Sequence, residues 1–232
     1  MRKPIAAGGV AIAIVALSLA LVGCGSDTKT QSSTSKTTAS SSKTTTSNTA
    51  APTSSAQASG PNYTIADYVK ENGIVETPIH HGDPGSPTVD LPVPAGWTLV
   101  QESQDAPYGG VVYSGAAAPN NPPWITAIFS KLTGNVDPAK ILEFAPGELK
   151  NLPQYEPVGD QSSSTLGGFN AVQLGGNYMR DGEKRIVGQK TVVIPGQDGL
   201  YVLQLNADAL DSDALPLMDA TNVIDEQTTI TP

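Results

Sequence analysis

The amino-acid sequence predicts an α+β domain over residues 61–232, with a central antiparallel sheet and helices packed on its faces. Three apolar segments late in the chain favour strands and are joined by short turns, a pattern typical of an antiparallel meander. Segments with helix-start signals lie before, between and after the predicted strands. The stretch is long enough for one domain with a sizeable core.

A first helix is predicted to begin at Thr64 and to end before Gly73. Thr64 and Asp67 resemble a capping box, which satisfies backbone N–H groups at a helix start. Five prolines interrupt residues 77–94, so this segment can hold only short extended pieces, one of them at residues 88–91. Further strands are predicted at residues 97–100, 110–113 and 124–132.

The second half of the domain begins with a helix start at Asp137 and Pro138, with Asp as the cap and Pro in the first turn. Pro146 and Gly147 interrupt this helix, and residues 148–152 are expected to add another turn. Three strands should then form the antiparallel meander, at residues 169–179, 184–194 and 200–206.

Turn and cap signals separate the last elements. Asp181-Gly182 is a two-residue hairpin signal, and residues 195–199 form a looser turn. Asp213 is expected to cap a final helix that runs to about Val223, with Pro216 tolerated in its first turn.

The N-terminus has the layout of a secretory signal. Arg2 and Lys3 precede an apolar run that is short for a stable transmembrane helix. Gly23 provides the small residue that a signal peptidase needs, and Cys24 follows at once. We therefore expect residues 1–23 to be removed as a signal peptide. The alternative is an uncleaved signal anchor with an incidental cysteine.

Cys24 is the predicted lipid attachment site. Its thiol can take a diacylglycerol thioether, and its new α-amino group can be acylated with a fatty acid such as palmitate. Three acyl chains hold a protein firmly in a membrane, whereas one chain is marginal. The expected location is extracytoplasmic and lipid-anchored to the cell membrane, with partial shedding or surface exposure as a variant. Cys24 is the single cysteine, so no intramolecular disulfide is expected.

Residues 25–60 consist almost entirely of Ser, Thr, Ala, Lys, Gln and Asn. Such a segment buries too little apolar surface to offset the entropy of ordering, so we interpret residues 24–60 as the lipidated cysteine followed by a disordered linker. The composition also suits O-glycosylation, and a plain spacer is the alternative.

The predicted domain is strongly acidic. From residue 61 onward it has 8 lysines and arginines against 21 aspartates and glutamates, a net charge of −13. This argues against nucleic acid as a partner, because phosphates require clustered Lys and Arg. It also argues against flat adhesion to an anionic lipid surface.

No catalytic constellation emerges from the sequence, so no enzyme activity, cofactor or metal is predicted. His80 and His81 are the only histidines, and adjacent side chains of an extended segment point in opposite directions. We therefore interpret them as a loop pair that fixes local hydrogen bonds. Aspartates 208, 211 and 213 lack the glycine and distal glutamate of an EF-hand loop.

Four aromatic residues lie next to Pro- and Gly-rich loops, where such side chains often line apolar pockets. With the two histidines they form the candidate surface for a ligand or partner, and ordinary core packing is the alternative. The four are Trp97, Tyr108, Tyr113 and Trp124.

The domain resembles the LpqN family of mycobacterial lipoproteins (Lpp-LpqN) from residue 61 to residue 232. The matching stretches are PNYTIADY at 61–68, TPIHHGDPGSP at 77–87, DPAK at 137–140, PGELKNLP at 146–153, LQLNADALD at 203–211 and NVIDEQTTI at 222–230. The resemblance implies a Mog1/PsbP-like α/β/α sandwich and a role in the mycolic-acid cell envelope. It brings no established catalytic residues to this chain.

The leading hypothesis is a non-enzymatic binding or scaffold lipoprotein for envelope biogenesis or transport. Its partners would be the membrane, through the lipid anchor, and a mycolate glycolipid. Envelope transport proteins or mycolyltransferases are the expected protein partners. The alternative is a surface or secreted protein that contacts host proteins.

Overall fold

The computed structural model of the protein describes residues 60–232. The predicted signal peptide, Cys24 and nearly all of the predicted linker lie outside the described residues. Within those residues, no helix combines the length and the apolar character needed to cross a bilayer.

Four helices and one 3₁₀ turn are present in the described part of the chain. The helices are α1 (Ile65–Glu71), α2 (Pro138–Phe144), α3 (Pro146–Lys150) and α4 (Ala214–Gln227), and the turn is η1 (Asp211–Asp213). The long strands are β5 (Trp124–Thr133), β8 (Phe169–Arg180), β9 (Glu183–Pro195) and β10 (Leu200–Leu210). The short strands are β1 (Val75–Pro78), β2 (Thr88–Asp90), β3 (Trp97–Val100), β4 (Gly110–Tyr113), β6 (Glu156–Pro157), β7 (Ser162–Leu166) and β11 (Thr229–Thr231).

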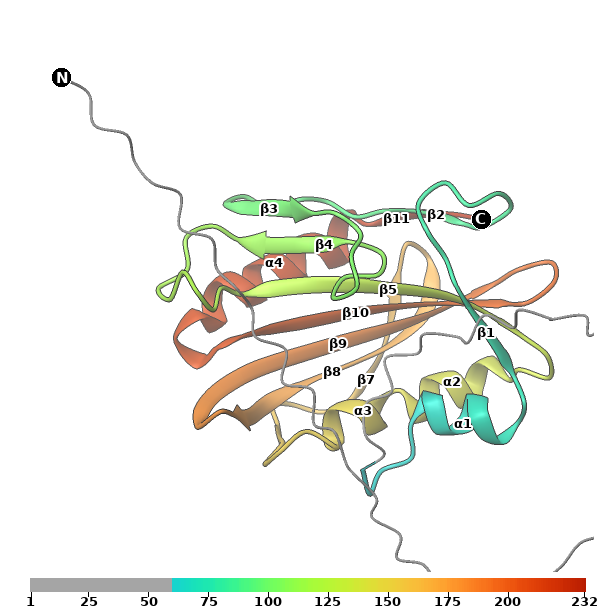
Figure 1. Ribbon diagram of the computed structural model, residues 1–232, viewed down its shortest axis with the longest axis horizontal. Helices are drawn as coiled ribbons and strands as arrows, with labels where there is room; N and C mark the ends of the chain where they lie inside the picture. Colours follow the sequence, from blue (N-terminus) through green and yellow to red (C-terminus); the bar gives the residue numbers. More distant parts are fainter. Residues whose placement is uncertain (1–59) are drawn as a thin grey trace, which may run out of the picture. The chain divides into compact units, whose positions relative to one another are not determined.

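Nine of the strands form one antiparallel sheet, whose order is β3-β4-β5-β10-β9-β8-β6 (Figure 1). β1 pairs with the C-terminal end of β5, residues 130–133, and β7 pairs with β8. β11 and β2 make a separate two-stranded sheet. The protein is therefore a mixed α/β domain built on a large antiparallel sheet, as predicted.

Helices cover both faces of the sheet, and in Figure 1 α4 lies behind the strands whereas α1, α2 and α3 gather at the lower edge of the view. On one face, which we call the α4 face, Leu203 and Leu205 of β10 pack with Leu217 and Ile224 of α4. We call the opposite face the α3 face. There the apolar clusters join alternate strand residues to α1, α2 and α3, and they are centred on Tyr68, Leu132, Ile141, Val193 and Val202, and on Leu149, Leu174, Tyr178 and Val187.

The predicted element order is confirmed. The capping box of Thr64 and Asp67 is formed, and Asp137 accepts the N–H of Ala139 at the start of α2. Asp181 and Gly182 both have positive φ, as the predicted two-residue hairpin requires. The strands of the meander extend beyond their predicted ends because β8, β9 and β10 continue to pair with one another.

Three features differ from the sequence prediction. β1 and β7 have little apolar alternation and form by backbone pairing to β5 and β8, which local pattern does not reveal. β11 likewise exists by pairing with β2. The Asp213 side chain does not cap α4, because the turn η1 precedes the helix and Asp213 accepts instead from the Ala117 N–H.

Candidate functional site

The α3 face of the sheet is polar along the strands that form its centre. Gln204, Asn206 and Asp208 alternate along β10, and Gln189 faces them from β9. A cleft of about 350 Å³ opens between these side chains and α3. We call it the α3 cleft.

Local sequence explains how α3 comes to lie over the sheet. Pro146 occupies the first turn of α3, where its missing N–H costs nothing. A Cβ at Gly147 would lie 2.0 Å from the carbonyl oxygen of Tyr63, so only glycine allows this close approach. Leu149 is buried in the cluster with Leu174 and Val187, which fixes the helix against the sheet. Glu148 is thereby held against the strands.

Glu148 is the centre of a polar network in which Gln189 is buried and the other side chains are half-buried. One of its carboxyl oxygens accepts hydrogen bonds from Gln189 Nε2 at 2.8 Å and from Gln204 Nε2 at 2.5 Å. Burial raises the pKa of Glu148, although the two amide donors act in the opposite direction. Gln189 Nε2 also donates to Asn206 Oδ1 at 3.0 Å.

Two buried polar side-chain atoms of β9 lack a hydrogen-bond partner among the described residues, namely Gln189 Oε1 and Thr191 Oγ1. Such atoms are rare in folded proteins because each carries a desolvation cost. Gln189 lines the α3 cleft, but its Oε1 is buried from solvent, so a bound molecule could reach this acceptor only if the side chain moved.

A buried ion pair closes one end of the cleft. Arg185 is 1% exposed and donates through Nε to Asp208 Oδ1 at 2.6 Å and through a second nitrogen to the same oxygen. Tyr178 donates its hydroxyl to Asp208 Oδ2 at 2.5 Å. Burial, followed by this hydrogen bond, raises the pKa of Tyr178 to about 12, so the hydroxyl keeps its proton. Arg180, 3.7 Å from Asp208, is the more exposed cation at the rim.

Apolar and aromatic side chains line the cleft beside the polar ones, since Trp124 is the cross-strand neighbour of Asp208 and Ile128 that of Gln204. Trp124 and Ile128 of β5 line it, and Leu149 and Leu152 close it from the α3 side. Trp124 is half-buried, so part of its ring system is available to a ligand. The cleft therefore combines a flat hydrophobic surface with fixed hydrogen-bonding groups, which is the common composition of small-molecule sites.

Of the four aromatic residues predicted to form a surface, Trp124 alone lines the α3 cleft. Trp97 and Tyr108 are buried in the core on the α4 face, so for these two the surface hypothesis is wrong. Tyr113 is partly buried and packs its ring against Trp97 at a centroid distance of 5.5 Å. A Pro- or Gly-rich neighbourhood did not distinguish core aromatics from exposed ones.

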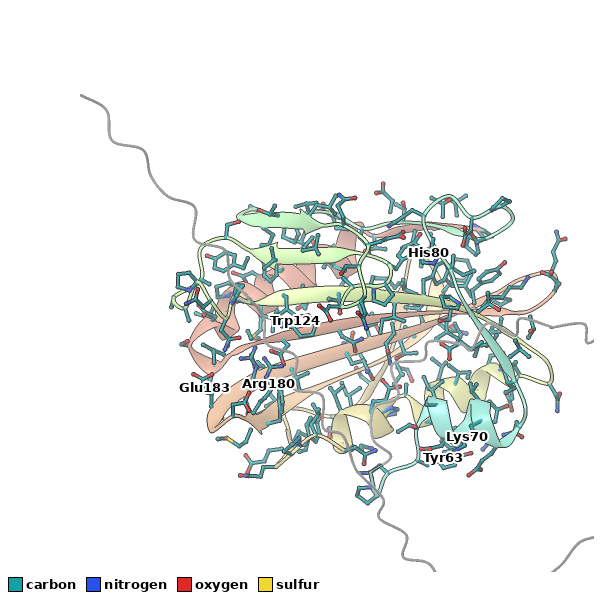
Figure 2. The ribbon with its side chains drawn as sticks, in the orientation of Figure 1. Tyr63, Lys70, His80, Trp124, Arg180 and Glu183 are labelled. Carbon is teal, nitrogen blue, oxygen red and sulfur yellow. The ribbon has the colours of Figure 1, made fainter. Side chains whose placement is uncertain are left out.

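His80 and His81 lie in a turn, toward the other end of the molecule from Arg180 (Figure 2). The assumption of an extended segment was wrong, because both histidines reach Glu102. His80 Nδ1 lies 2.9 Å from Glu102 Oε2, and the His81 N–H donates to Oε1 at 2.8 Å. The His81 ring stacks on Tyr108.

This histidine pair fixes local hydrogen bonds, as interpreted from the sequence. The His81 N–H donor, followed by the His80 ring, holds the pKa of Glu102 below its usual range. Across residues 60–232, no three His, Cys, Asp or Glu side chains gather in a way that could hold a metal ion. Asp208 and Asp211 form ion pairs with Arg185 and Lys184 respectively.

The sequence analysis missed the residues that define the α3 cleft, namely Glu148, Gln189, Gln204, Asn206 and Asp208. The available signal was the alternation of β10, in which a polar residue recurs at every second position through a strand predicted to be central. Such a pattern was consistent with a solvent-facing side of the sheet, and nothing in the sequence showed that α3 covers it.

Comparison with known proteins agrees with the resemblance seen in the sequence. The sequence model of the family described as "Probable lipoprotein LpqN" (Lpp-LpqN) matches residues 61–231. This chain belongs to the LpqN family. Lipoprotein LpqN of Mycobacterium tuberculosis (strain ATCC 25618 / H37Rv) is 68% identical over 222 residues, which cover 96% of this chain and 97% of that protein.

A solved structure supports the fold of this LpqN-family chain. The crystal structure of LpqN "involved in cell envelope biogenesis of Mycobacterium tuberculosis" matches with a TM-score of 0.73 and 68% identity. The match covers 75% of this chain and all of the solved one. The family name places the chain among lipoproteins, a class associated with the cell envelope.

Proposed function

We propose that this LpqN-family protein is a non-enzymatic envelope lipoprotein that binds a mycolate glycolipid, with the sugar headgroup in the α3 cleft. One observation carries the proposal: the centre of the sheet presents the half-buried amides of Gln204 and Asn206 to a cleft that the half-buried Trp124 also lines. Natural proteins seldom bury such a surface without a use for it.

The chemistry of the cleft suits a sugar. Sugar hydroxyls both donate and accept hydrogen bonds, and the amides of Gln204 and Asn206, held by Glu148 and Gln189, offer both kinds of group. Trp124 offers a flat apolar surface against which the C–H face of a sugar ring can pack. The domain's acidic charge disfavours a polyanionic ligand, whereas a neutral sugar is unaffected by it.

The same groups favour binding over turnover. Among the described residues, no Ser, Cys or His lines the cleft, so its lining holds none of the usual nucleophile–base pairs. Asp208 is committed to Arg185 and Tyr178, and Glu148 to two glutamines. These two carboxyl groups therefore organise the site, and the third in the lining, Asp105, is exposed.

Native mass spectrometry of the protein purified from a mycolate-producing host, with organic extraction of bound lipid, tests the proposal. We expect a stoichiometric mycolate glycolipid. Gln204→Leu removes a cleft donor and Trp124→Ala removes the apolar wall, so each should lower glycolipid occupancy several-fold. Gln101→Leu makes the same chemical change at an exposed position outside the cleft and should leave occupancy unchanged. A protein that emerges free of lipid, or that loses lipid equally in all three variants, contradicts the proposal.

We also propose that the chain is cleaved before Cys24 and anchored by acyl chains on that residue. The layout of residues 1–24 and the lipoprotein family support this. Intact mass of the native protein should show loss of residues 1–23 and addition of a diacylglycerol and a fatty acyl group. A Cys24→Ser variant should appear in the soluble extracytoplasmic fraction, and its retention in the membrane would count against the anchor.

A protein partner is the second candidate function, favoured by two exposed apolar side chains on α4. Leu215 is 73% exposed and Met218, one turn later, is 52% exposed. Such a pair suits contact with an envelope transport protein, a mycolyltransferase or a host protein. Cross-linking from position 215 in the intact envelope, with and without Met218→Lys, tests this candidate function.

The Mog1/PsbP-like grouping implied by the resemblance is likewise a proposal, supported by helices on both faces of the sheet.

A further inference from the structure

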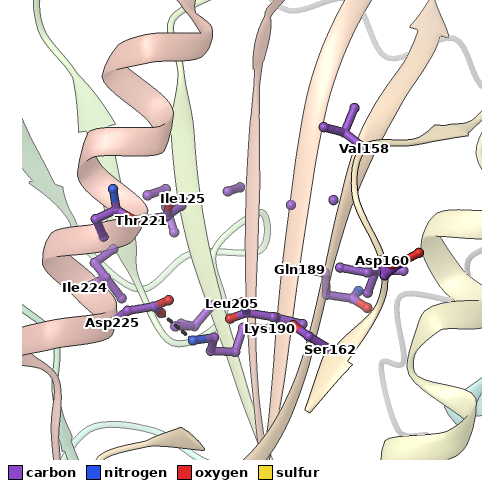
Figure 3. A pocket seen from close by; sticks show the side chains of 16 residues that line it. Ile125, Val158, Asp160, Ser162, Gln189, Lys190, Leu205, Thr221, Ile224 and Asp225 are labelled. Atoms are coloured by element: carbon purple, nitrogen blue, oxygen red, sulfur yellow. Dashed lines mark ion pairs between the residues drawn. The ribbon is translucent and has the colours of Figure 1, made fainter. Parts of the chain in front are cut away.

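The α4 face contains a second pocket, on the side of the sheet opposite the α3 cleft, and Gln189 and Ala207 line both. Figure 3 shows it between α4 and strands β8 and β9. Its volume is about 260 Å³. At about 30 Å³ per water molecule this is room for about nine waters, which suits a ligand of about ten heavy atoms. We call it the α4 pocket.

The floor of the α4 pocket is made by a row of small residues. Gly175, Gly188 and Ala207 are direct neighbours on β8, β9 and β10. A Cβ at Gly188 would meet only the Cβ of Ala207, at 3.9 Å, so the missing side chain leaves open space. Leu205 and Ile224 flank this row and add apolar surface, while Gln173 and Asn222 add polar groups to the lining.

An ion pair lies at the edge of the apolar floor. Lys190 reaches from β9 to α4, where its Nζ lies 2.7 Å from Asp225 Oδ1 (Figure 3). The Lys190 side chain is 8% exposed and that of Asp225 is 37% exposed. An ammonium group has three donors, and the Asp225 contact uses one of them. The pair therefore presents both N–H donors and a carboxylate acceptor to a molecule in the pocket.

We propose that the α4 pocket binds an uncharged amphiphile with a hydroxyl-bearing head and a short alkyl body. The alkyl part would lie on the row of small residues. The head would accept from Lys190 and donate to Asp225. This site is independent of the proposed function of the α3 cleft.

Charge selects a neutral head over an ionic one. The charges of Lys190 and Asp225 compensate each other, and Asp160 adds a further negative charge at the rim. Each ionic head would compete with a member of the pair, a carboxylate with Asp225 for Lys190 and an ammonium with Lys190 for Asp225, and would leave the displaced charge without its partner. Hydroxyl groups can use both members of the pair without disturbing it. The exposed Val158 at the rim gives the alkyl body further apolar surface.

Three probes of about ten heavy atoms test the selectivity in NMR titrations of the purified protein: 1,2-octanediol, octanoate and octylammonium. We expect saturable shifts of the Gly188, Lys190 and Asp225 amides with the diol. Affinity for octanoate and for octylammonium should be at least about tenfold lower. Shifts that do not saturate would overturn the proposal. Equal affinity for all three probes would also overturn it, because it would show that the pocket does not recognise the head group.

Three variants distinguish recognition of the ligand's head group from a purely structural role of the pocket residues. Gly188→Val fills the floor with a residue that strands favour, so it should abolish diol binding while the melting temperature is kept or raised. Lys190→Met removes the donor and should weaken the diol about tenfold. Asp225→Asn leaves Lys190 without its counter-charge, so octanoate should gain affinity and overtake the diol.

The reversal in Asp225→Asn is the decisive signature, because a purely structural ion pair predicts no change in ligand preference. Unchanged diol binding in Gly188→Val would also overturn the proposal. If Gly188→Val fails to fold, the Lys190 and Asp225 variants decide alone. Gln204→Leu, in the α3 cleft, should leave diol binding intact, so the two sites can fail separately.

Discussion

The two faces of the sheet are built from the same strands yet differ in chemistry. Along β10, Leu203, Leu205 and Ala207 point to the α4 face, while Gln204 and Asp208 point to the α3 face. Helices cover both faces, so both sets are withdrawn from solvent. Asp208 is 4% exposed, which is nearly as buried as Leu203 at 0%.

The difference shows that burial alone does not indicate whether a surface stabilises the fold or binds a ligand. On the α4 face, burial of apolar surface stabilises the fold by roughly 25 cal/mol per Å². On the α3 face, burial opposes folding unless every polar group finds a partner. There the protein forms the Glu148 network and the Arg185–Asp208 pair, and it still leaves Gln189 Oε1 without a partner among the described residues. The centre of the α4 face is mainly apolar packing, whereas the α3 face combines two apolar clusters with a polar cleft.

The largest effect should come from breaking the buried ion pair on the α3 face. Asp208→Ala leaves the Arg185 guanidinium, 1% exposed, without its counter-charge, which should cost about 3–5 kcal/mol in the free energy of unfolding. Urea denaturation followed by circular dichroism measures it. The double variant Arg185→Met, Asp208→Leu should recover most of the loss, and a double variant as unstable as the single one would contradict this view of the pair.

A substitution that creates a cavity on the α4 face should lower the free energy of unfolding nearly as much, but it should leave ligand binding in the α3 cleft unchanged. Leu203→Ala is expected to destabilise the protein by about 2–5 kcal/mol, because Leu203 is fully buried. Glycolipid affinity, measured well below the unfolding transition, should be unchanged. A matching loss of affinity would show that the two faces do not act separately.

The substitution Glu148→Gln tests the contrast between the two faces through the pH dependence of protein stability. Because burial raises the pKa of Glu148, its stabilising contribution is present below the unfolded pKa of about 4.3 and is lost as pH rises through the folded pKa. The glutamine variant does not titrate, so its stability relative to wild type should increase as pH rises through this window. Urea midpoints at pH 4, 6 and 8 measure it, and a constant difference across the three would contradict the assignment.

The smallest effect is expected at Glu102, whose pKa moves in the opposite direction. The His81 N–H holds the pKa of Glu102 down, so its contribution is present above about pH 4.3 and is lost as pH falls through the folded pKa. The side chain is 30% exposed, so Glu102→Gln should cost at most about 1 kcal/mol at pH 7. The difference from wild type should shrink toward pH 3, and growth of the difference there would contradict the sign.

Much of the fold could be predicted because its signals are local. The Thr64–Asp67 capping box, the Asp137-Pro138 helix start and the Asp181-Gly182 turn each act within a few residues. β1 and β7 could not be predicted, since distant partners create them. The α3 cleft was missed for the same reason, because Glu148 and Gln204 meet only when α3 packs on the sheet.

A titration of the protein with trehalose, followed by the NMR signals of the Trp124 indole N–H and the Gln189 and Gln204 side-chain amides, tests the central claim most directly. These groups report the aromatic wall and the polar floor of the α3 cleft. If the cleft binds a sugar headgroup, all three signals should move together and saturate, while signals of Leu203 and Ile224 on the α4 face stay in place. Absence of saturable shifts at the cleft, or shifts confined to the α4 face, would contradict the claim.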